Sequence, residues 1–174
     1  LTYRKMRDRN ILHGEVFQHA PSSGRNPIKL NRQDFNEIRE LGQLEIVRGL
    51  TKFLSIGGLY AEETLIRAQI NKEAPCNSLT EHELDRIFDQ LNQLLSVLNA
   101  GNAEPCIVID EMGTWVDVTP VPLKKYAQYN QKKYETFNEA LDDYYMELTV
   151  KEETVETAKG VEQELARQQR ILQR

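Results

Sequence analysis

A run of small residues between two helix-like stretches has the composition of a phosphate-binding turn. The run is Leu54–Ala61, and it contains Ser55, Gly57 and Gly58. Small side chains let the main chain approach a phosphate closely, and the first N–H groups of a following helix point outward at the positive end of its dipole. Such a grip holds nucleic acid without reading its sequence. The alternative is that the two glycines only make a tight turn.

The same run resembles the helix-hairpin-helix pattern, in which a glycine–apolar–glycine turn joins two helices and an alanine packs against the first helix. Ser55 stands where the pattern has its first glycine, and Gly57 and Ala61 stand at the second glycine and the alanine. Glu62 and Glu63 are interpreted as favourable charges in the first turn of the second helix. Basic residues flank the run, so the predicted nucleic-acid-binding residues here are Arg48, Lys52, Ser55, Gly57, Gly58 and Arg67.

Positive charge gathers at the N-terminal end of an acidic chain. The 174 residues include 22 Lys+Arg and 27 Asp+Glu, a formal net charge of −5. Residues 1–32 nevertheless hold seven basic and two acidic side chains. Phosphate contacts are local, because charges are screened within about 8–10 Å at physiological salt. We therefore add Arg4, Lys5, Arg7, Arg9 and Arg25 to the candidate site; a solvated basic tail is the alternative.

The sequence lacks a constellation for catalysis or metal binding. His13, His19 and His82 do not have metal-ligand spacing, and Cys76 and Cys106 are not clustered with other ligands. A disulfide scaffold or zinc site is therefore not indicated, and a reduced, cytoplasmic setting is expected. We expect no enzyme activity, no metal and no cofactor. No run of about 18 uncharged apolar residues is present, so neither a membrane span nor a signal peptide is predicted.

Aromatic side chains occur repeatedly between residues 115 and 145. They could stack on bases. Packing where a C-terminal helix meets the domain is the simpler alternative. The residues are Trp115, Tyr126, Tyr129, Tyr134, Tyr144 and Tyr145.

Apolar spacing predicts a mainly α-helical domain after a linker at residues 20–27, which is rich in proline, glycine and serine. A short helix from about residue 33 and a longer one from about residue 44 precede the small-residue run, and a third helix follows it to residue 70. Thr80 and Glu83 form a capping box that starts a core helix, and Gly101 suits its C-terminal end.

The hydrophobic period changes after Pro105. Residues 106–109 and 115–118 predict a small β-hairpin, which the prolines at 120 and 122 end. Thr136 and Glu139 form a second capping box, and an apolar stripe continues from there to residue 174. A helix of that length would reach about 58 Å. We predict a long C-terminal coiled-coil helix that needs a partner helix.

Several blocks together resemble the NFACT family of ribosome-associated quality-control factors, once described as fibronectin-binding proteins. The resemblance spans about residues 1–150, and the blocks at 57–63 and 137–145 are specific when found in this order. The matching residues are Met6–Arg9, Gly14, Phe17, Pro21, Asn26–Pro27, Gly57–Glu63, Arg67–Ala68, Pro105–Asp110, Val118–Leu123, Tyr126 and Phe137–Tyr145.

The resemblance implies a helix-hairpin-helix domain at 28–133, preceded by the tail of an N-terminal lobe (1–27) and followed by the start of a coiled-coil arm (136–174). Family members bind a large ribosomal subunit with a stalled peptidyl-tRNA and recruit tRNA for C-terminal tailing. The implied partners are large-subunit rRNA and tRNA, with ribosomal proteins or a ubiquitin ligase reached through the coiled coil. Because the chain opens with Leu1, we interpret it as a fragment that lacks most of that lobe, and we do not expect tailing from it.

Two function classes follow from these observations. The first is a non-enzymatic RNA- and ribosome-binding module that uses the basic N-terminal segment and the small-residue run. The second is a rigid protein-interaction spacer with no direct nucleic-acid contact, in which the glycines are purely structural. A DNA-repair role is also open, because helix-hairpin-helix motifs are common there, but no catalytic lysine, aspartate or cluster ligand supports it.

Overall fold

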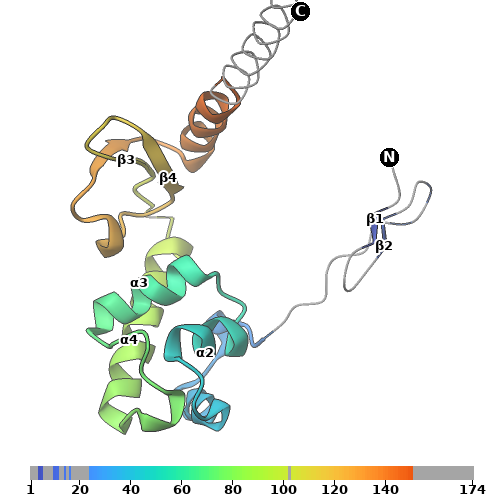
Figure 1. The fold of residues 1–174 in the computed structure, drawn as a ribbon, viewed down its shortest axis with the longest axis vertical. Coiled ribbons are helices and arrows are strands. Elements are labelled where there is room, and N and C mark those ends of the chain that lie inside the picture. Colours follow the sequence, from blue (N-terminus) through green and yellow to red (C-terminus); the bar gives the residue numbers. More distant parts are fainter. Residues whose placement is uncertain are drawn as a thin grey trace, which may run out of the picture. The chain divides into compact units, whose positions relative to one another are not determined.

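The computed structural model describes residues 24–101 and 103–150, together with residues 4, 5, 10, 11, 14 and 16 near the N-terminus. The chain divides into two compact units, Leu1–Leu95 and Ser96–Arg174, and each is described by itself (Figure 1). The domain limits predicted after residues 27 and 133 remain predictions.

The first unit is built from short helices around one apolar core. The expected helices before and after the small-residue run are confirmed, although the first is partly 3-10. In chain order the helices are η1 (Pro27–Lys29), α1 (Arg32–Phe35), η2 (Asn36–Leu41), α2 (Ile46–Phe53), α3 (Gly58–Ala68), η3 (Cys76–Ser78) and α4 (Glu81–Asn99), whose last turn falls in the second unit. A two-stranded pairing of β1 (Arg4–Lys5) with β2 (Asn10–Ile11), not predicted from the sequence, belongs to the same unit.

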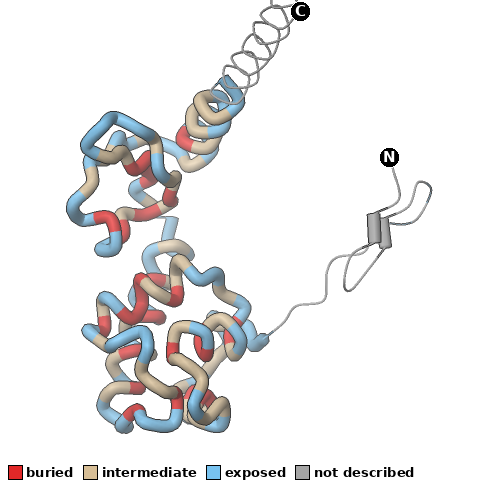
Figure 2. Tube along the Cα trace, viewed as in Figure 1, coloured by how far each residue is buried: buried red, intermediate tan, exposed pale blue. Residues whose placement is uncertain are grey.

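The core of this unit gathers apolar side chains from every helix between α1 and α4 (Figure 2). Phe35 is fully buried, and its ring packs against Phe53 and Phe88 with centroid distances of 6.3 and 5.6 Å. Leu50 from α2 and Leu65 from α3 join it at 0% and 1% exposure. The apolar positions spaced by three and four residues in the sequence are therefore the ones that form the core.

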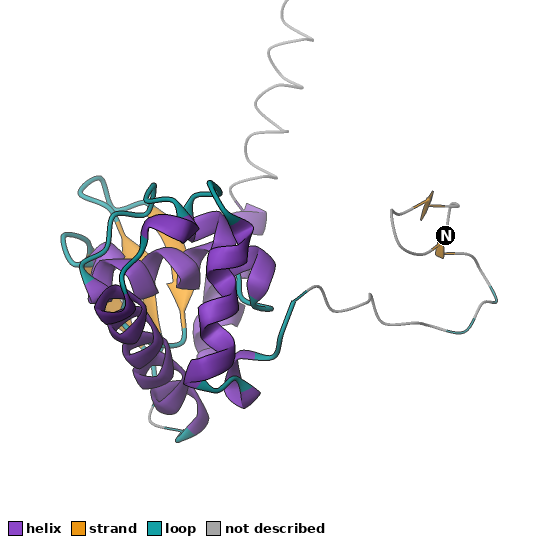
Figure 3. Ribbon diagram, turned by 90° about the horizontal axis from the view of Figure 1, so that it is seen from below, coloured by secondary structure: helices purple, strands orange, loops and turns teal. Residues whose placement is uncertain are grey.

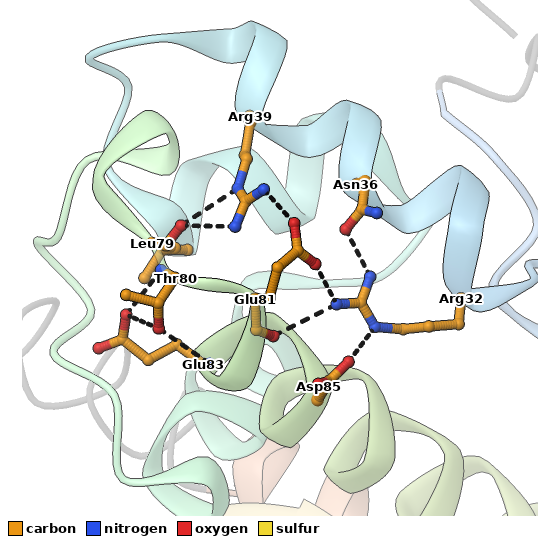
Figure 4. Close-up of polar contacts among 8 residues, drawn as sticks. All are labelled: Arg32, Asn36, Arg39, Leu79, Thr80, Glu81, Glu83 and Asp85. Atoms are coloured by element: carbon orange, nitrogen blue, oxygen red, sulfur yellow. Dashed lines mark hydrogen bonds and ion pairs between the residues drawn. The ribbon is translucent and has the colours of Figure 1, made fainter.

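The start of α4 is fixed by the predicted capping box and by two arginines (Figure 4). The Thr80 N–H donates to Glu83 Oε2 at 2.8 Å, and the Glu83 N–H donates back to Thr80 Oγ1 at 3.3 Å. Arg39 donates to the Leu79 carbonyl at 2.8 Å through Nη2, and Arg32 pairs with Asp85 at 2.6 Å. These bonds tie α1 and η2 to the first turn of α4.

The second unit contains a three-stranded antiparallel sheet. Strands β3 (Cys106–Ile109) and β4 (Trp115–Thr119) form the predicted hairpin, and β5 (Asn130–Lys133), which was not predicted, pairs with the other side of β3. The order is β4-β3-β5, so β5 is an edge strand. Figure 3 distinguishes these strands from the helices. The 3-10 turn η4 (Lys124–Tyr126) leads into β5.

A helix at residues 137–150 follows the sheet. Its predicted capping box is confirmed, because the Thr136 N–H donates to Glu139 Oε2 at 3.1 Å. Tyr134 donates to Asp143 Oδ2 at 2.7 Å, and Tyr144 donates to the Val116 carbonyl at 3.1 Å. For these two tyrosines the packing alternative is therefore supported. The predicted coiled-coil segment beyond residue 150 lies outside the described residues.

Candidate nucleic-acid interface

The connection between α2 and α3 is the small-residue run singled out in the sequence. It occupies residues 54–57, and Ser55, Gly57 and Gly58 are all exposed. Gly57 has φ −72° and ψ 156°, which any residue can adopt, and Gly58 is the first residue of α3. A Cβ atom built on either glycine meets nothing within 4 Å. Neither turn conformation nor packing explains the two glycines, so the tight-turn alternative does not account for them.

The start of α3 has no side-chain cap. The N-cap residue is Gly57, which makes no side-chain cap hydrogen bond, whereas the Asn31 side chain caps α1. The Tyr60 and Ala61 N–H groups both donate to the Gly57 carbonyl at 3.1 Å. The N-terminal end of α3 therefore presents bare backbone and a positive dipole end beside two glycines.

Residues 24–25 are attached to this connection by the main chain. The Arg25 N–H donates to the Phe53 carbonyl at 2.8 Å, and the Ser55 N–H donates to the Arg25 carbonyl at 3.0 Å. The Ser55 hydroxyl donates to the Gly24 carbonyl at 3.2 Å. Gly24 has φ +99°, and a Cβ there would lie 2.8 Å from the Leu54 carbonyl carbon. Only glycine fits at this point of the attachment.

The Arg25 guanidinium has partners of its own within the first unit. It forms an ion pair with Glu37 and lies 4.9 Å from the centroid of the Phe53 ring. Its side chain is still 41% exposed. The structure thus brings Arg25 and Ser55 together, as parts of one attachment.

Arg48 and Lys52 lie one turn apart on α2, on the stretch that leads into the connection. Arg48 forms a 3.2 Å ion pair with Glu45, and its side chain remains 71% exposed. Lys52 is exposed, and among the described residues no side-chain partner is seen for it. An exposed pair such as Arg48–Glu45 contributes about 0–1 kcal/mol. Both cations can therefore turn toward an external anion.

Arg67, unlike Arg48 and Lys52, is mostly buried in an ion pair within the fold. It pairs at 2.5 Å with Glu63, one turn earlier on α3, and its side chain is only 19% exposed. Neither Glu62 nor Glu63 lies in the first turn of α3, which begins at Gly58, so their interpretation as first-turn charges is wrong. Glu63 is also fully buried. A buried carboxylate requires a charged or hydrogen-bonding partner. Arg67 therefore stabilises the fold, and we leave it out of the interface considered below.

The N-terminal candidates are described only in part. Arg4 and Lys5 form strand β1, in register with Ile11 and Asn10. Arg7 and Arg9 lie outside the described residues.

Sequence reasoning missed the residues that attach the segment at 24–25, namely Gly24, Glu37 and Phe53. Gly24 stood in a loop among other turn-forming residues, and nothing in the local pattern indicated its contact with Leu54. Within the described part of the chain, no cluster of three His, Cys, Asp or Glu could hold a metal ion. No described helix has the length and hydropathy to cross a bilayer.

The geometry defines a mainly helical module with an exposed, glycine-containing connection between two helices. The sequence matches the family model of the NFACT N-terminal and middle domains over residues 1–174, and the chain belongs to the NFACT family. It is 33% identical to the archaeal Rqc2 homolog aRqcH of Methanocaldococcus jannaschii over 95% of its own length.

The fold also resembles a solved structure described as the fibrinogen binding protein from Staphylococcus aureus. The TM-score is 0.55 at 17% sequence identity, over 82% of this chain and 49% of that one. At this identity the likeness concerns the fold. The chain spans about a quarter of the length of the archaeal relative and about half of the staphylococcal chain.

Proposed function

We propose that this chain is a non-enzymatic RNA- and ribosome-binding module of a cytoplasmic ribosome-associated quality-control factor. The ribosome-associated role is what membership of the NFACT family implies, and the similarity to the archaeal Rqc2 homolog supports it. In the whole protein, the module would help to bind large subunits that carry stalled peptidyl-tRNA and to recruit tRNA for C-terminal tailing. The contacted partners would be rRNA and tRNA, and α2 and α3 with their connection would act as a helix-hairpin-helix.

The observation that carries RNA contact is the pair of glycines with open space around them. Gly57 and Gly58 leave bare main chain at the uncapped start of α3, and Arg48 and Lys52 are exposed on the preceding helix. A phosphate can approach such a backbone closely, while the two side chains supply charge. The rest of the interface is the attached segment at 24–25, which stabilises the connection.

The helix at 137–150 would be the beginning of the coiled-coil arm. Tyr145, Met146 and Val150 are 59–68% exposed on it. In the complete factor this arm would reach ribosomal proteins or a ubiquitin ligase. The rival function, a rigid spacer without RNA contact, assigns all recognition to other parts of the protein.

The test is co-sedimentation of the chain with purified large ribosomal subunits across a salt series. Arg48→Gln/Lys52→Gln lowers the net charge by two at the interface. The matched control, Asn92→Glu/Gln93→Glu, lowers it by the same amount at exposed positions of α4. We expect salt-sensitive binding that the first variant weakens roughly tenfold at low salt and the control leaves nearly unchanged. Equal binding by both variants, or salt-independent binding, would favour the spacer.

A further inference from the structure

The three-stranded sheet of the second unit has two outer edges, one along β4 and one along β5. In an antiparallel pair, the backbone N–H and C=O groups of alternate residues point toward the neighbouring strand, and those of the residues between them point away. An outer edge therefore presents a row of donors and acceptors that need partners or solvent. The two edges of this sheet meet that need differently.

The outward-pointing residues of β5 follow from its register with β3. The Tyr134 N–H donates to the Pro105 carbonyl at 2.9 Å, one position beyond the end of the ladder. Because bonded pairs alternate along an antiparallel ladder, the next bonded residue of β5 is Lys132. The main-chain groups of Gln131 and Lys133 therefore point away from β3.

These outward groups of β5 have no protein partner in the described part of the chain, where no hydrogen bond from another element reaches the main chain of Gln131 or Lys133. Gln131 is partly exposed, and the other three residues of the strand are exposed. Each of the two residues leaves one donor and one acceptor for an external partner. An extended backbone of this kind is the template on which another strand can be added.

The opposite edge, along β4, is closed by side chains. The Val116 carbonyl accepts from the Tyr144 hydroxyl at 3.1 Å. The Val118 N–H, which points outward because Ile107 opposite it bonds to β5, donates to Asp117 Oδ1 at 2.8 Å. A strand added to β4 would have to displace both bonds. The sheet is therefore protected on one side and open to pairing on the other.

The charges of β5 select the kind of strand that can pair with it. Lys132 and Lys133 are successive strand residues, so their side chains lie on opposite faces of the sheet. Each has one acidic neighbour, Asp143 at 3.1 Å and Glu104 at 3.0 Å, and these four side chains are 45–68% exposed. An added strand also has side chains on both faces, where acidic residues would lie beside one lysine on each. Pairing between two copies of β5 would instead bring lysines together, which disfavours it.

We propose that the outer edge of β5 binds an extended acidic segment of a partner protein as a fourth strand of the sheet. Main-chain hydrogen bonds to Gln131 and Lys133 hold the segment, and the lysines on the two faces select negative side chains over positive ones. The inference does not depend on the proposed function, because it concerns the other unit and a protein ligand.

The first experiment compares two labelled synthetic peptides of about seven residues, one alternating glutamate with valine and the other alternating lysine with valine. Fluorescence anisotropy, with the 174-residue chain as titrant, measures both affinities. We expect the acidic peptide to bind roughly tenfold more tightly at low salt, since opposite charges across a strand pair attract and like charges repel. Because the chain has a net charge of −5, non-specific attraction would favour the basic peptide. Equal affinities, or tighter binding of the basic peptide, would overturn the proposal.

Amide hydrogen exchange, followed by NMR on the unmodified chain, tests where the acidic peptide binds. The peptide should slow exchange at Gln131 and Lys133, whose N–H groups point outward, and should leave the Lys132 N–H, already bonded to β3, nearly unchanged. Protection elsewhere, or none, would overturn the β5 site. The same pattern without peptide, growing with protein concentration, would assign the edge to a second copy of the chain and would also overturn the proposal.

A proline variant removes one of the bonds without changing the charge. Gln131→Pro deletes an outward N–H, and such an edge position tolerates proline because the ladder bonds to β3 are not involved. Gln131→Thr is the matched control, which keeps the N–H. We expect the proline variant to bind the acidic peptide roughly tenfold more weakly and the control to bind it normally.

Equal binding by the two Gln131 variants would overturn strand addition. The fluorescence spectrum of Trp115, which lies on β4, shows whether the sheet of the proline variant is intact. If that sheet is lost, the exchange pattern of the unmodified chain still decides between the outcomes. Binding to ribosomal subunits is measured separately, with Arg48→Gln/Lys52→Gln, so either proposal can fail without the other.

Discussion

Gly58 shows how one residue can separate stability from binding. It begins α3, and a Cβ there meets nothing within 4 Å. We expect Gly58→Ala to leave the fold intact or to stabilise it by about 0.4–1 kcal/mol, since alanine restricts the unfolded chain. The added methyl group should nevertheless weaken subunit binding, because it stands where a phosphate would approach the backbone. Thermal unfolding measures the change in stability, and co-sedimentation with large subunits on the same samples measures the change in binding. Unchanged binding would mean that the bare backbone is not used.

The sequence identifies which basic residues are candidates for binding, but it does not reveal which side chains they pair with in the fold. Arg48 and Arg67 look equivalent in the sequence, since each lies on a helix that flanks the same connection. In the structure one is 71% exposed and the other is 19% exposed beside the buried Glu63. Burial of Glu63 depends on how α3 rotates against the core, which local spacing does not determine. The candidate site was therefore located by its glycines, while the roles of individual arginines needed the packing.

At the scale of elements, the capping box of α4 is the feature most open to a pH test. The backbone N–H and the hydroxyl of Thr80 hydrogen-bond the Glu83 carboxylate and lower the pKa of Glu83. The stabilisation is therefore present above about pH 4.3, the usual pKa of glutamate, and is lost as the pH falls through the lower value of the folded chain.

We expect Glu83→Gln to keep most of the stability at pH 7, because glutamine can also close a capping box. The same variant should lose less stability than the unmodified chain as the pH falls below about 4.3. Urea unfolding at pH 7 and at successively lower values measures both effects. An identical pH profile in the two proteins would show that the carboxylate makes no net contribution through this bond.

Elements with a strong apolar pattern or a cap were predicted correctly, whereas the short or polar strands β1, β2 and β5 were not. The helices from α2 to α4 and the β3–β4 hairpin follow from apolar periodicity and from Thr80 and Pro120. Strand β5 has the sequence Asn-Gln-Lys-Lys and buries no residue fully. It forms because β4 pairs with only one edge of β3, and the backbone groups on the other edge hydrogen-bond with β5. Such a strand is stabilised by pairing with its neighbour, so its own sequence lacks the apolar alternation that would predict it.

At the scale of the whole chain, each unit can be probed separately. Gly49 on α2 faces Cys76, and a Cβ there would lie 2.4 Å from the Cys76 sulfur. We expect Gly49→Ala to destabilise the first unit by about 1–3 kcal/mol through overpacking. The far-UV circular dichroism of α2, α3 and α4 should then be lost at lower urea. Trp115, the single tryptophan, lies in the second unit, and its fluorescence transition should stay in place.

The control for this prediction is Gly49→Ala combined with Cys76→Ala. Removal of the sulfur makes room for the new methyl group, so the double variant should be more stable than the sum of the two single effects. A simultaneous shift of both probes in Gly49→Ala would show instead that the two units unfold as one.

The attachment of residues 24–25 also has a mechanical meaning. Arg25 bridges Leu54 in parallel, through backbone bonds of 2.8 and 3.0 Å to Phe53 and Ser55. A pull on the chain ahead of Gly24 would therefore load the α2–α3 connection directly. Tension on that side would be transmitted to the backbone proposed to hold RNA, so the proposed RNA contact would respond to force.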